Sequence, residues 1–256
     1  MSDAMDVETP KLLSPCPGCF VRQEVDNIGW VDMSDHVVVV DALEQAGLEA
    51  QVLEAIRSTC GGKPVRTVVN THTHSDHTAL NGAFRAHFGA TIVNARTHPI
   101  PPAGLSWTCG ARRLEVLGAP GCHTAEDVVV WLPRERLLFV GDIFGWGLIP
   151  WDRALDRPRL DHIVATYRRL ADLEPAVVVP GHGPLGTAAE LRRWVCYVEE
   201  LVSQVRALCS DGTRRRDLDP SAVPPPADMR HWWRFLKWKH ADAVAKVVQA
   251  VSRGRL

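Results

Sequence analysis

The chain of 256 residues lacks several features that mark special classes of protein. Its formal net charge is −1, so no excess of positive charge attracts nucleic acid or an anionic membrane. No apolar run approaches the roughly 18 residues that a membrane-spanning helix requires. Residues 1–10 have neither the basic nor the apolar segment of a secretory signal. We therefore expect a soluble cytoplasmic protein with a small-molecule substrate, no nucleic-acid partner and no transmembrane segment.

Cysteine is present but does not form a framework. The chain has 7 cysteines, an odd number at scattered spacings, which favours reduced thiols over a set of disulfides. Cys16 and Cys19 have CxxC spacing, yet no second pair accompanies them. We interpret this segment as an N-terminal turn that carries two thiols, with a zinc or redox motif as the alternative.

Hydrophobic residues make up 46% of the chain, which is enough for a sizeable core. Composition divides the chain into four parts. Residues 1–19 are predicted to be a loosely ordered lead-in, and residues 20–209 a main domain. Residues 210–230 contain an arginine run and three consecutive prolines, which is typical of a linker. Residues 231–256 are predicted to form a C-terminal helix that packs on the main domain or covers its site as a lid.

Hydrophobic periodicity predicts both strands and helices in the main domain. The predicted strands span residues 20–25, 29–33, 36–41, 65–70, 91–94, 114–117, 128–132, 137–140 and 176–179. The predicted helices span residues 43–60, 79–88, 161–173, 188–208 and 231–251. This succession indicates sheets flanked by helices. Periodicity alone does not distinguish a doubly wound sheet from two packed sheets.

Histidines and aspartates gather directly after four of the predicted strands. They are His72, His74, Asp76, His77, His123, Asp142 and His182. Loops at strand ends are where binding sites are usually assembled. The set exceeds what one tetrahedral metal needs, and it suits two metals that share a carboxylate. Imidazole and carboxylate ligands suit zinc, and iron or manganese when the carboxylate content is high.

The run from His72 to His77 resembles the HxHxDH signature of the metallo-β-lactamase superfamily. The resemblance extends over about residues 20–190, since His123, Gly141-Asp142 and the segment 180–183 (Pro-Gly-His-Gly) follow in the expected order. It implies an α/β (α+β) fold, a four-layer αββα sandwich with metals at one edge of the sheets, here with a C-terminal helical extension. It also implies the ligand sets: His72, His74 and His123 for one metal, Asp76, His77 and His182 for the other, and Asp142 between them.

Three departures from the family pattern refine the expectation. Cys122 separates Gly121 from His123, where the family usually has Gly directly before His. Cys122 is therefore either a small structural residue or a neighbour of the metal ligands. The true β-lactamases carry Cys or Ser where Asp142 stands, so Asp142 resembles the glyoxalase II, lactonase, thioesterase and nuclease branches. The lactonase branch has a Tyr shortly after the bridging Asp. In this chain Gly145 and Trp146 occupy that region instead, which argues against acyl-homoserine lactones as substrates.

The resemblance and the full ligand set predict a binuclear zinc hydrolase. A hydroxide bridging the metals would attack an ester, thioester or lactone carbonyl of a small, partly apolar substrate. Asp76 is the expected catalytic residue, because it can orient the hydroxide and pass a proton to the leaving group. The alternative is an iron-dependent oxidase or dioxygenase, or with less support a phosphodiesterase or nuclease. His74 favours zinc, because the diiron branch has Glu at that position.

Further residues are candidates for the walls of the site. Phe144, Trp146, Ile149 and Trp151 follow Asp142, and they either line the substrate pocket or pack under the loop. Thr71, Thr124 and Cys122 are candidates for contacts that orient the ligands. The tryptophan-rich segment 231–239 is expected to dock on the main domain, with a lid or a homodimer contact as alternatives.

Overall fold

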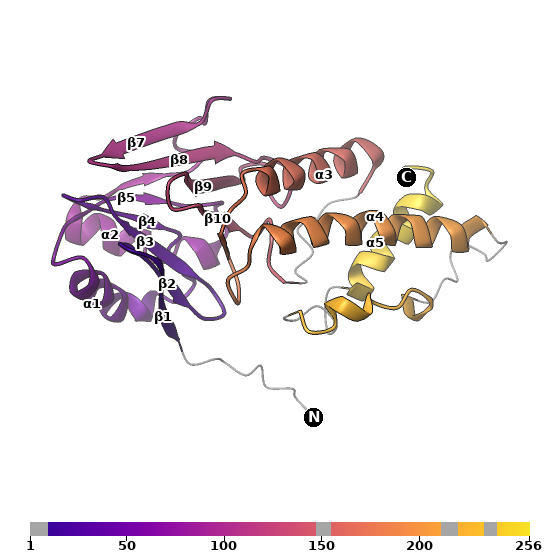
Figure 1. Cartoon of the computed structure of the whole chain (residues 1–256), viewed down its shortest axis with the longest axis horizontal. Coiled ribbons are helices and arrows are strands. Elements are labelled where there is room, and N and C mark those ends of the chain that lie inside the picture. Colours follow the sequence, from indigo (N-terminus) through magenta and orange to yellow (C-terminus); the bar gives the residue numbers. More distant parts are fainter. Residues whose placement is uncertain (1–9, 147–154, 211–219, 233–239) are drawn as a thin grey trace.

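The structure is a computed structural model that describes residues 10–146, 155–210, 220–232 and 240–256 (Figure 1). Its strands form two sheets. The first has the order β1-β2-β3-β4-β5-β6, with antiparallel pairs from β1 to β4 and parallel pairs from β4 to β6. Its strands are Lys11–Cys16, Cys19–Gln23, Ile28–Asp32, Val37–Val40, Val65–Val69 and Thr91–Val93.

The second sheet has the order β11-β10-β9-β8-β7. Its strands are β7 (Leu105–Cys109), β8 (Arg112–Gly118), β9 (Val128–Leu132), β10 (Leu137–Gly141) and β11 (Val177–Pro180). The pairs from β7 to β10 are antiparallel, and β11 is parallel to β10.

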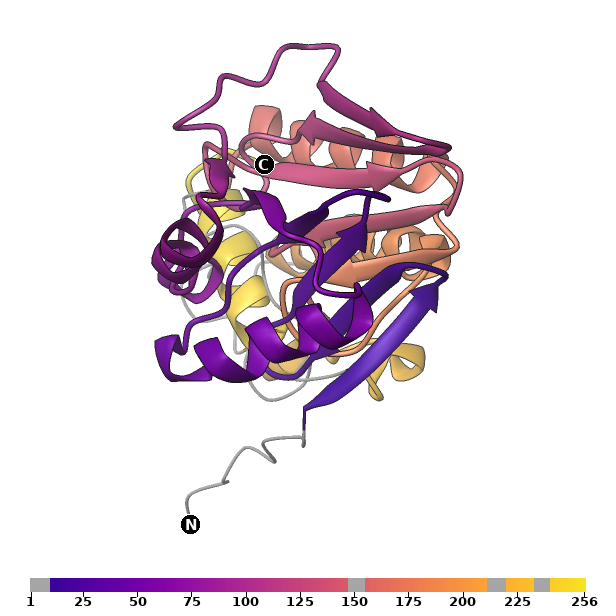
Figure 2. The same ribbon diagram turned by 90° about the vertical axis from the view of Figure 1, so that its left-hand side faces the viewer.

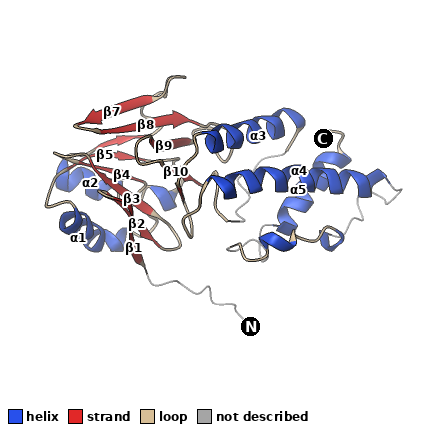
Figure 3. Cartoon of the chain, viewed as in Figure 1, coloured by secondary structure: helices blue, strands red, loops and turns tan. Residues whose placement is uncertain are grey.

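Helices cover the outer faces of both sheets (Figures 1 and 3). The first sheet carries α1 (Glu49–Thr59) and α2 (Asn81–Phe88), and Figure 2 shows α1 lying across its strands. The second sheet carries α3 (Arg157–Asp172) and α4 (Ala188–Ser210), with α5 (His240–Ser252) packed against α4. This arrangement confirms the predicted αββα sandwich. Short 3-10 turns occur at Ala46–Leu48, Ser75–His77, Pro220–Ala222 and Ala227–Met229.

Strand β4 shows why two packed sheets form. Its four valines are all buried, and successive side chains of a strand point to opposite faces. Val38 and Val40 lie in the core between the sheets, whereas Val37 and Val39 lie in the core beneath α1 and α2. An apolar run with both faces buried therefore specifies a strand with a sheet on one side and helices on the other.

Strand direction gathers the loops of the predicted site at one edge. Strands β4 and β5 are parallel, so Asp41 and the segment 70–77 emerge together. Strands β8 and β10 run the same way because both are antiparallel to β9, and β11 runs parallel to β10. The loops that follow β8, β10 and β11 carry His123, Asp142 and His182.

Three predicted boundaries need correction. The lead-in is ordered from Lys11 on as edge strand β1, whose mostly exposed side chains give no core-facing pattern. The edge strand β7 was not predicted either, although Leu105, Trp107 and Cys109 alternate along it and pack, only partly buried, against the core between the sheets. The C-terminal helix begins at His240 in the described part of the chain, while Trp232 lies outside it and is buried. Cys16 and Cys19 flank the turn between β1 and β2, as predicted.

Candidate metal centre

Three imidazoles converge at the shared edge of the sheets. The rings of His72, His74 and His123 have centroids 4.6 to 4.9 Å apart and stand nearly perpendicular to one another, at 80° to 90°. The closest nitrogens, His123 Nε2 and His74 Nδ1, are 3.1 Å apart. One nitrogen from each ring lies within 4.8 Å of the other two. Such convergence suits three ligands of one tetrahedral metal with an open fourth position.

A second cluster lies beside the first and combines Asp76, His77, Asp142 and His182. His182 Nε2 is 3.3 Å from Asp76 Oδ2 and 3.2 Å from Asp142 Oδ1. His77 Nε2 is 3.6 Å from the same Asp76 oxygen and 3.2 Å from the same Asp142 oxygen. The pairing of imidazoles with carboxylates gives a harder donor set than three imidazoles do.

The carboxylate of Asp142 lies between the two clusters. Its Oδ1 faces His77 and His182, each at 3.2 Å from the ring nitrogen. Its Oδ2 lies 3.2 Å from His182 Nε2, 3.7 Å from His123 Nε2 and 3.9 Å from His72 Nε2. The carboxylate is therefore within reach of both clusters, which is the position expected of a bridging ligand.

The charges at the site favour cations. The pKa of His72 falls to about 3, chiefly because the ring is buried and also because His77 is close, so the ring is neutral near pH 7. Burial lowers the pKa of His77, but Asp41 and Asp142 outweigh burial and raise it well above its usual value. Burial raises the pKa of Asp142, but His182 and His77 hold it well below the usual range. Carboxylates here attract positive charge strongly enough to hold protons on imidazoles.

Several nitrogen and oxygen atoms of the site that could bind a metal are fully buried and have no hydrogen-bond partner. They are Nε2 of His72, both ring nitrogens of His77 and Oδ1 of Asp142. Buried polar atoms without partners are costly, and native proteins normally pair them. Bound cations would satisfy the atoms that face the clusters, so the residues present fit divalent metal binding.

Asp41 supports the first-sheet loop and was not singled out from the sequence. Its carboxylate accepts hydrogen bonds from the backbone N–H of Thr71 at 2.8 Å and from the Thr71 hydroxyl at 2.9 Å. Its Oδ2 also lies 3.1 Å from His77 Nδ1. Contacts of this kind fix the orientation of an imidazole ligand. Thr71, predicted to orient ligands, also lies 3.3 Å from His72 Nδ1 through its hydroxyl.

The loop that carries His182 is held by the β2–β3 connection. Asn27 donates two side-chain hydrogen bonds, to Pro180 O at 2.9 Å and Gly183 O at 2.8 Å. Asp26 Oδ1 lies 3.1 Å from His182 Nδ1. Neither residue was predicted, because single polar residues in a short connection carry no pattern before the fold brings them to a distant loop.

Asp127 organises the loop of His123. Its carboxylate accepts from the backbone N–H groups of His123 and Thr124, and from the Thr124 hydroxyl at 2.6 Å. Thr124 therefore acts through Asp127 on the shape of this loop. Cys122 is buried in the core beside α3, and its thiol hydrogen-bonds with Thr166. The structure thus favours a packing role for Cys122 over contact with a metal ligand.

The aromatic residues after Asp142 have different roles. Phe144 is only 1% exposed and belongs to the core, so of the two predicted alternatives it packs under the loop. Trp146 is partly buried, its ring lies 5.1 Å from that of Trp232, and its indole N–H donates to Pro184 O. Trp232 also stacks on Trp194. Ile149 and Trp151 lie outside the described residues.

Comparison with known proteins identifies the family. The sequence profile described as the metallo-beta-lactamase superfamily matches residues 22–120 and 108–182. The chain belongs to this superfamily. A hydroxyacylglutathione hydrolase from Albidiferax ferrireducens is 33% identical over 196 residues, which cover 72% of this chain and 67% of the relative. A second enzyme of that name, from Brucella anthropi, is 29% identical over 212 residues, covering 79% and 76%.

Solved structures of the superfamily share the fold. A metallo-beta-lactamase family protein from Thermus thermophilus aligns with a TM-score of 0.62 at 18% identity, over 94% of this chain and 95% of the other.

The chain spans about half the length of two further hydroxyacylglutathione hydrolases, 47% for Rhizobium meliloti and 54% for Rhizobium etli. No helix in the described part of this superfamily member is long and apolar enough to cross a membrane.

Proposed function

We propose that this protein is a hydrolase that uses two zinc ions to cleave an ester, thioester or lactone of a small substrate. The main support for the proposal is the position of Asp142, whose carboxylate lies within reach of both histidine clusters. A single-metal or purely structural site needs no such shared carboxylate. Two divalent ions at this centre would polarise a carbonyl oxygen and lower the pKa of a bound water toward neutrality.

The side chains divide the chemistry between them. His72, His74 and His123 would hold the metal that faces the carbonyl oxygen, and His77 and His182 would hold the second metal with Asp76. Asp76 is 25% exposed and Asp142 is 5% exposed. Asp76 is therefore the carboxylate on the open side of the cluster, where it can orient a water and transfer a proton to the leaving group. We propose it as the catalytic residue.

Thioesters are the first substrate class to test. Two relatives that match over more than two thirds of this chain are named hydroxyacylglutathione hydrolases, a name that describes removal of an acyl group from glutathione. The substitution of Asp for the β-lactamase Cys or Ser at position 142 agrees with that branch. Trp146 remains a candidate wall of the pocket, since it follows Asp142 closely and is only partly buried.

An iron-dependent oxidase is the competing function on this fold. Solved structures of a diiron chemotaxis sensor and of a rubredoxin:oxygen oxidoreductase align with TM-scores of 0.56. Their identities of 17% and 15% establish only the fold. The three-imidazole cluster with His74 in place favours zinc. Metal analysis of protein purified without added metal distinguishes the two, because an oxidase would contain iron.

The test is a substrate screen across a hydroxyacyl-glutathione thioester, a lactone, an aryl ester and a phosphodiester. We expect zinc-dependent hydrolysis in one of the first three classes. His72→Ala and Asp76→Ala should each reduce it to the background rate while circular dichroism stays native. His87→Ala is the matched control, because His87 is an exposed histidine on α2 that pairs with Glu49. Undiminished turnover in Asp76→Ala would disprove the proposed mechanism.

A further inference from the structure

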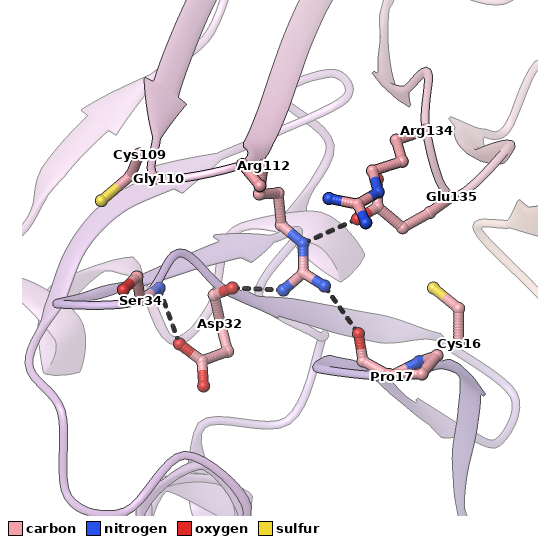
Figure 4. A pocket seen from close by; sticks show the side chains of 10 residues that line it. Cys16, Pro17, Asp32, Ser34, Cys109, Gly110, Arg112, Arg134 and Glu135 are labelled. Carbon is pink, nitrogen blue, oxygen red and sulfur yellow. Dashed lines mark hydrogen bonds and ion pairs between the residues drawn. The ribbon is translucent and has the colours of Figure 1, made fainter.

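A second chemically distinctive site lies at the opposite end of the sandwich from the histidine clusters. Four hairpin turns meet there, between β1 and β2, β3 and β4, β7 and β8, and β9 and β10. They surround a cavity of about 520 Å³. Figure 4 shows its lining, which combines two thiols with charges of both signs: Cys16, Asp32, Cys109, Arg112, Arg134 and Glu135.

The first of these turns holds two cysteines opposite each other. Cys16 and Cys19 are direct partners in the antiparallel register of β1 and β2, with Pro17 and Gly18 between them. Gly18 has a φ of 74°, as the third residue of a type II turn requires, and proline suits the second position. Such a turn brings its outer Cα atoms within about 7 Å, and a disulfide needs about 4.4 to 6.8 Å. Both thiols are free in this structure.

Arg112 from the second sheet fixes this turn. Its guanidinium donates to Pro17 O at 2.6 Å, and its Nε donates to Glu135 at 2.9 Å (Figure 4). The guanidinium also donates to Gly18 O at 3.4 Å. The peptide between the two thiols is thus held on both carbonyls. A fixed turn keeps the thiols in one arrangement instead of letting the hairpin end fray.

The two thiols differ in access. Cys16 is partly exposed and lines the cavity, whereas Cys19 is fully buried. The interaction between the two thiols lowers the pKa of Cys16, and with burial it raises the pKa of Cys19, so the exposed Cys16 is the better thiolate. Cys109, on the same cavity, donates to Asp35 at 3.2 Å, and this bond raises its pKa. The cavity therefore presents one accessible nucleophile backed by one buried thiol.

We propose that Cys16 and Cys19 are a modification site that reacts with low-molecular-weight disulfides and closes to an intramolecular disulfide. The Cys16 thiolate attacks one sulfur of R–S–S–R, forms a mixed disulfide and expels RS⁻. The Cys19 sulfur then attacks the sulfur of Cys16, forms the Cys16–Cys19 bond and expels the second RS⁻. The protein loses two protons and two electrons, and the small disulfide gains them as two thiols.

The cavity also indicates which small disulfides fit. Its volume is in the range of small-molecule sites, and Arg112 and Arg134 line it together with Asp32 and Glu135, among which Arg112 pairs with Glu135 and Asp32 pairs with Lys63. Disulfides of amino acids or short peptides carry both an ammonium and carboxylates, and so match side chains of both signs. Oxidised glutathione belongs to this class and serves as the probe.

The experiment is peptide mapping of the full chain, as purified, after incubation with oxidised glutathione and alkylation of the remaining thiols. Trypsin cleaves after Lys11 and Arg22, so residues 12–22 contain both cysteines and no others. In the wild type we expect this peptide to be unalkylated and lighter by two hydrogen atoms than the dithiol peptide. Cys19→Ser should instead retain one glutathionyl group on Cys16, because no resolving thiol is left.

Two controls complete the test. Cys109→Ser removes the other thiol of the cavity and should leave formation of the Cys16–Cys19 disulfide unchanged. Cys16→Ser should leave Cys19 unmodified, since Cys19 has no exposed surface. A wild-type peptide that is alkylated at both cysteines after incubation overturns the proposal, and this readout does not depend on how any variant folds. A mixed disulfide that persists in the wild type overturns the role of Cys19.

Discussion

At the scale of single residues, Asp41 shows how a side chain that reaches no substrate can decide the geometry of a site. It follows β4, and its carboxylate joins the Thr71 backbone and hydroxyl to the ring of His77. Only 4% of the residue is exposed, so water does not replace these contacts when they are lost. Its negative charge also raises the pKa of His77.

We expect Asp41→Asn to weaken zinc binding by about 10- to 100-fold, as removal of such orienting partners typically does. The amide keeps the size of the side chain but removes the charge beside His77. Competition against a chelator of known affinity measures the change. Asp172→Asn on the exposed side of α3 is the control and should bind zinc like the wild type. Equal affinity in both variants would show that Asp41 does not orient the ligands.

At the scale of elements, the loops after β10 and β11 lie so close that only glycine fits between them. A Cβ built on Gly181 would overlap Asp142 Oδ1 and lie 2.8 Å from His77 Cε1. The backbone at Gly181 is not in the left-handed region, so alanine is excluded there by space and not by conformation.

Gly181→Ala should therefore displace Asp142 and lower the zinc content of the purified protein below that of the wild type, measured by elemental analysis. Gly82→Ala is the matched control. Nothing lies within 4 Å of a Cβ at Gly82, which is exposed on α2. Alanine there should raise helix stability by up to about 1 kcal/mol and leave the zinc content unchanged. Full zinc loading of Gly181→Ala would contradict the close packing of the two loops.

The elements that could be predicted from the sequence are those whose burial follows directly from a run of apolar residues. The valine run of β4 is buried on both faces, as are Val68 and Val69 at the end of β5, so composition alone predicted these strands. Edge strands β1 and β7 expose much of their surface and were missed. The seven residues predicted as metal ligands could be selected because they cluster after such buried strands, and the structure brings them together in two groups. Asp26, Asn27 and Asp41 were not, because their partners lie in loops that only the fold brings near.

At the scale of the whole molecule, each of the two clusters combines residues that follow strands of both sheets. His72, His74, Asp76 and His77 follow β5 of the first sheet, and His123, Asp142 and His182 follow strands of the second. Bound metals would therefore connect the two sheets. Ligands that bind only the folded state stabilise it, by about 2.7 kcal/mol when their free concentration is 100 times the dissociation constant.

Removal of metal with a chelator should accordingly lower the melting temperature by several degrees, and restored zinc should recover it. Thermal unfolding followed by circular dichroism measures the shift. His72→Ala should lose part of the recovery, because the first cluster would lack one of its ligands. A melting temperature that is the same with and without zinc would mean that the clusters hold no metal in the folded protein.

The division of each cluster between the two sheets also constrains when the centre can form during synthesis. The first cluster is incomplete until His123 has been synthesised. The second is incomplete until the synthesis of His182, which follows β11, the last strand of the second sheet in the sequence. A nascent chain that has folded only its first sheet exposes two histidines of the first cluster without the third. Its capacity to retain metal should appear late in translation, after both sheets have left the ribosome and docked.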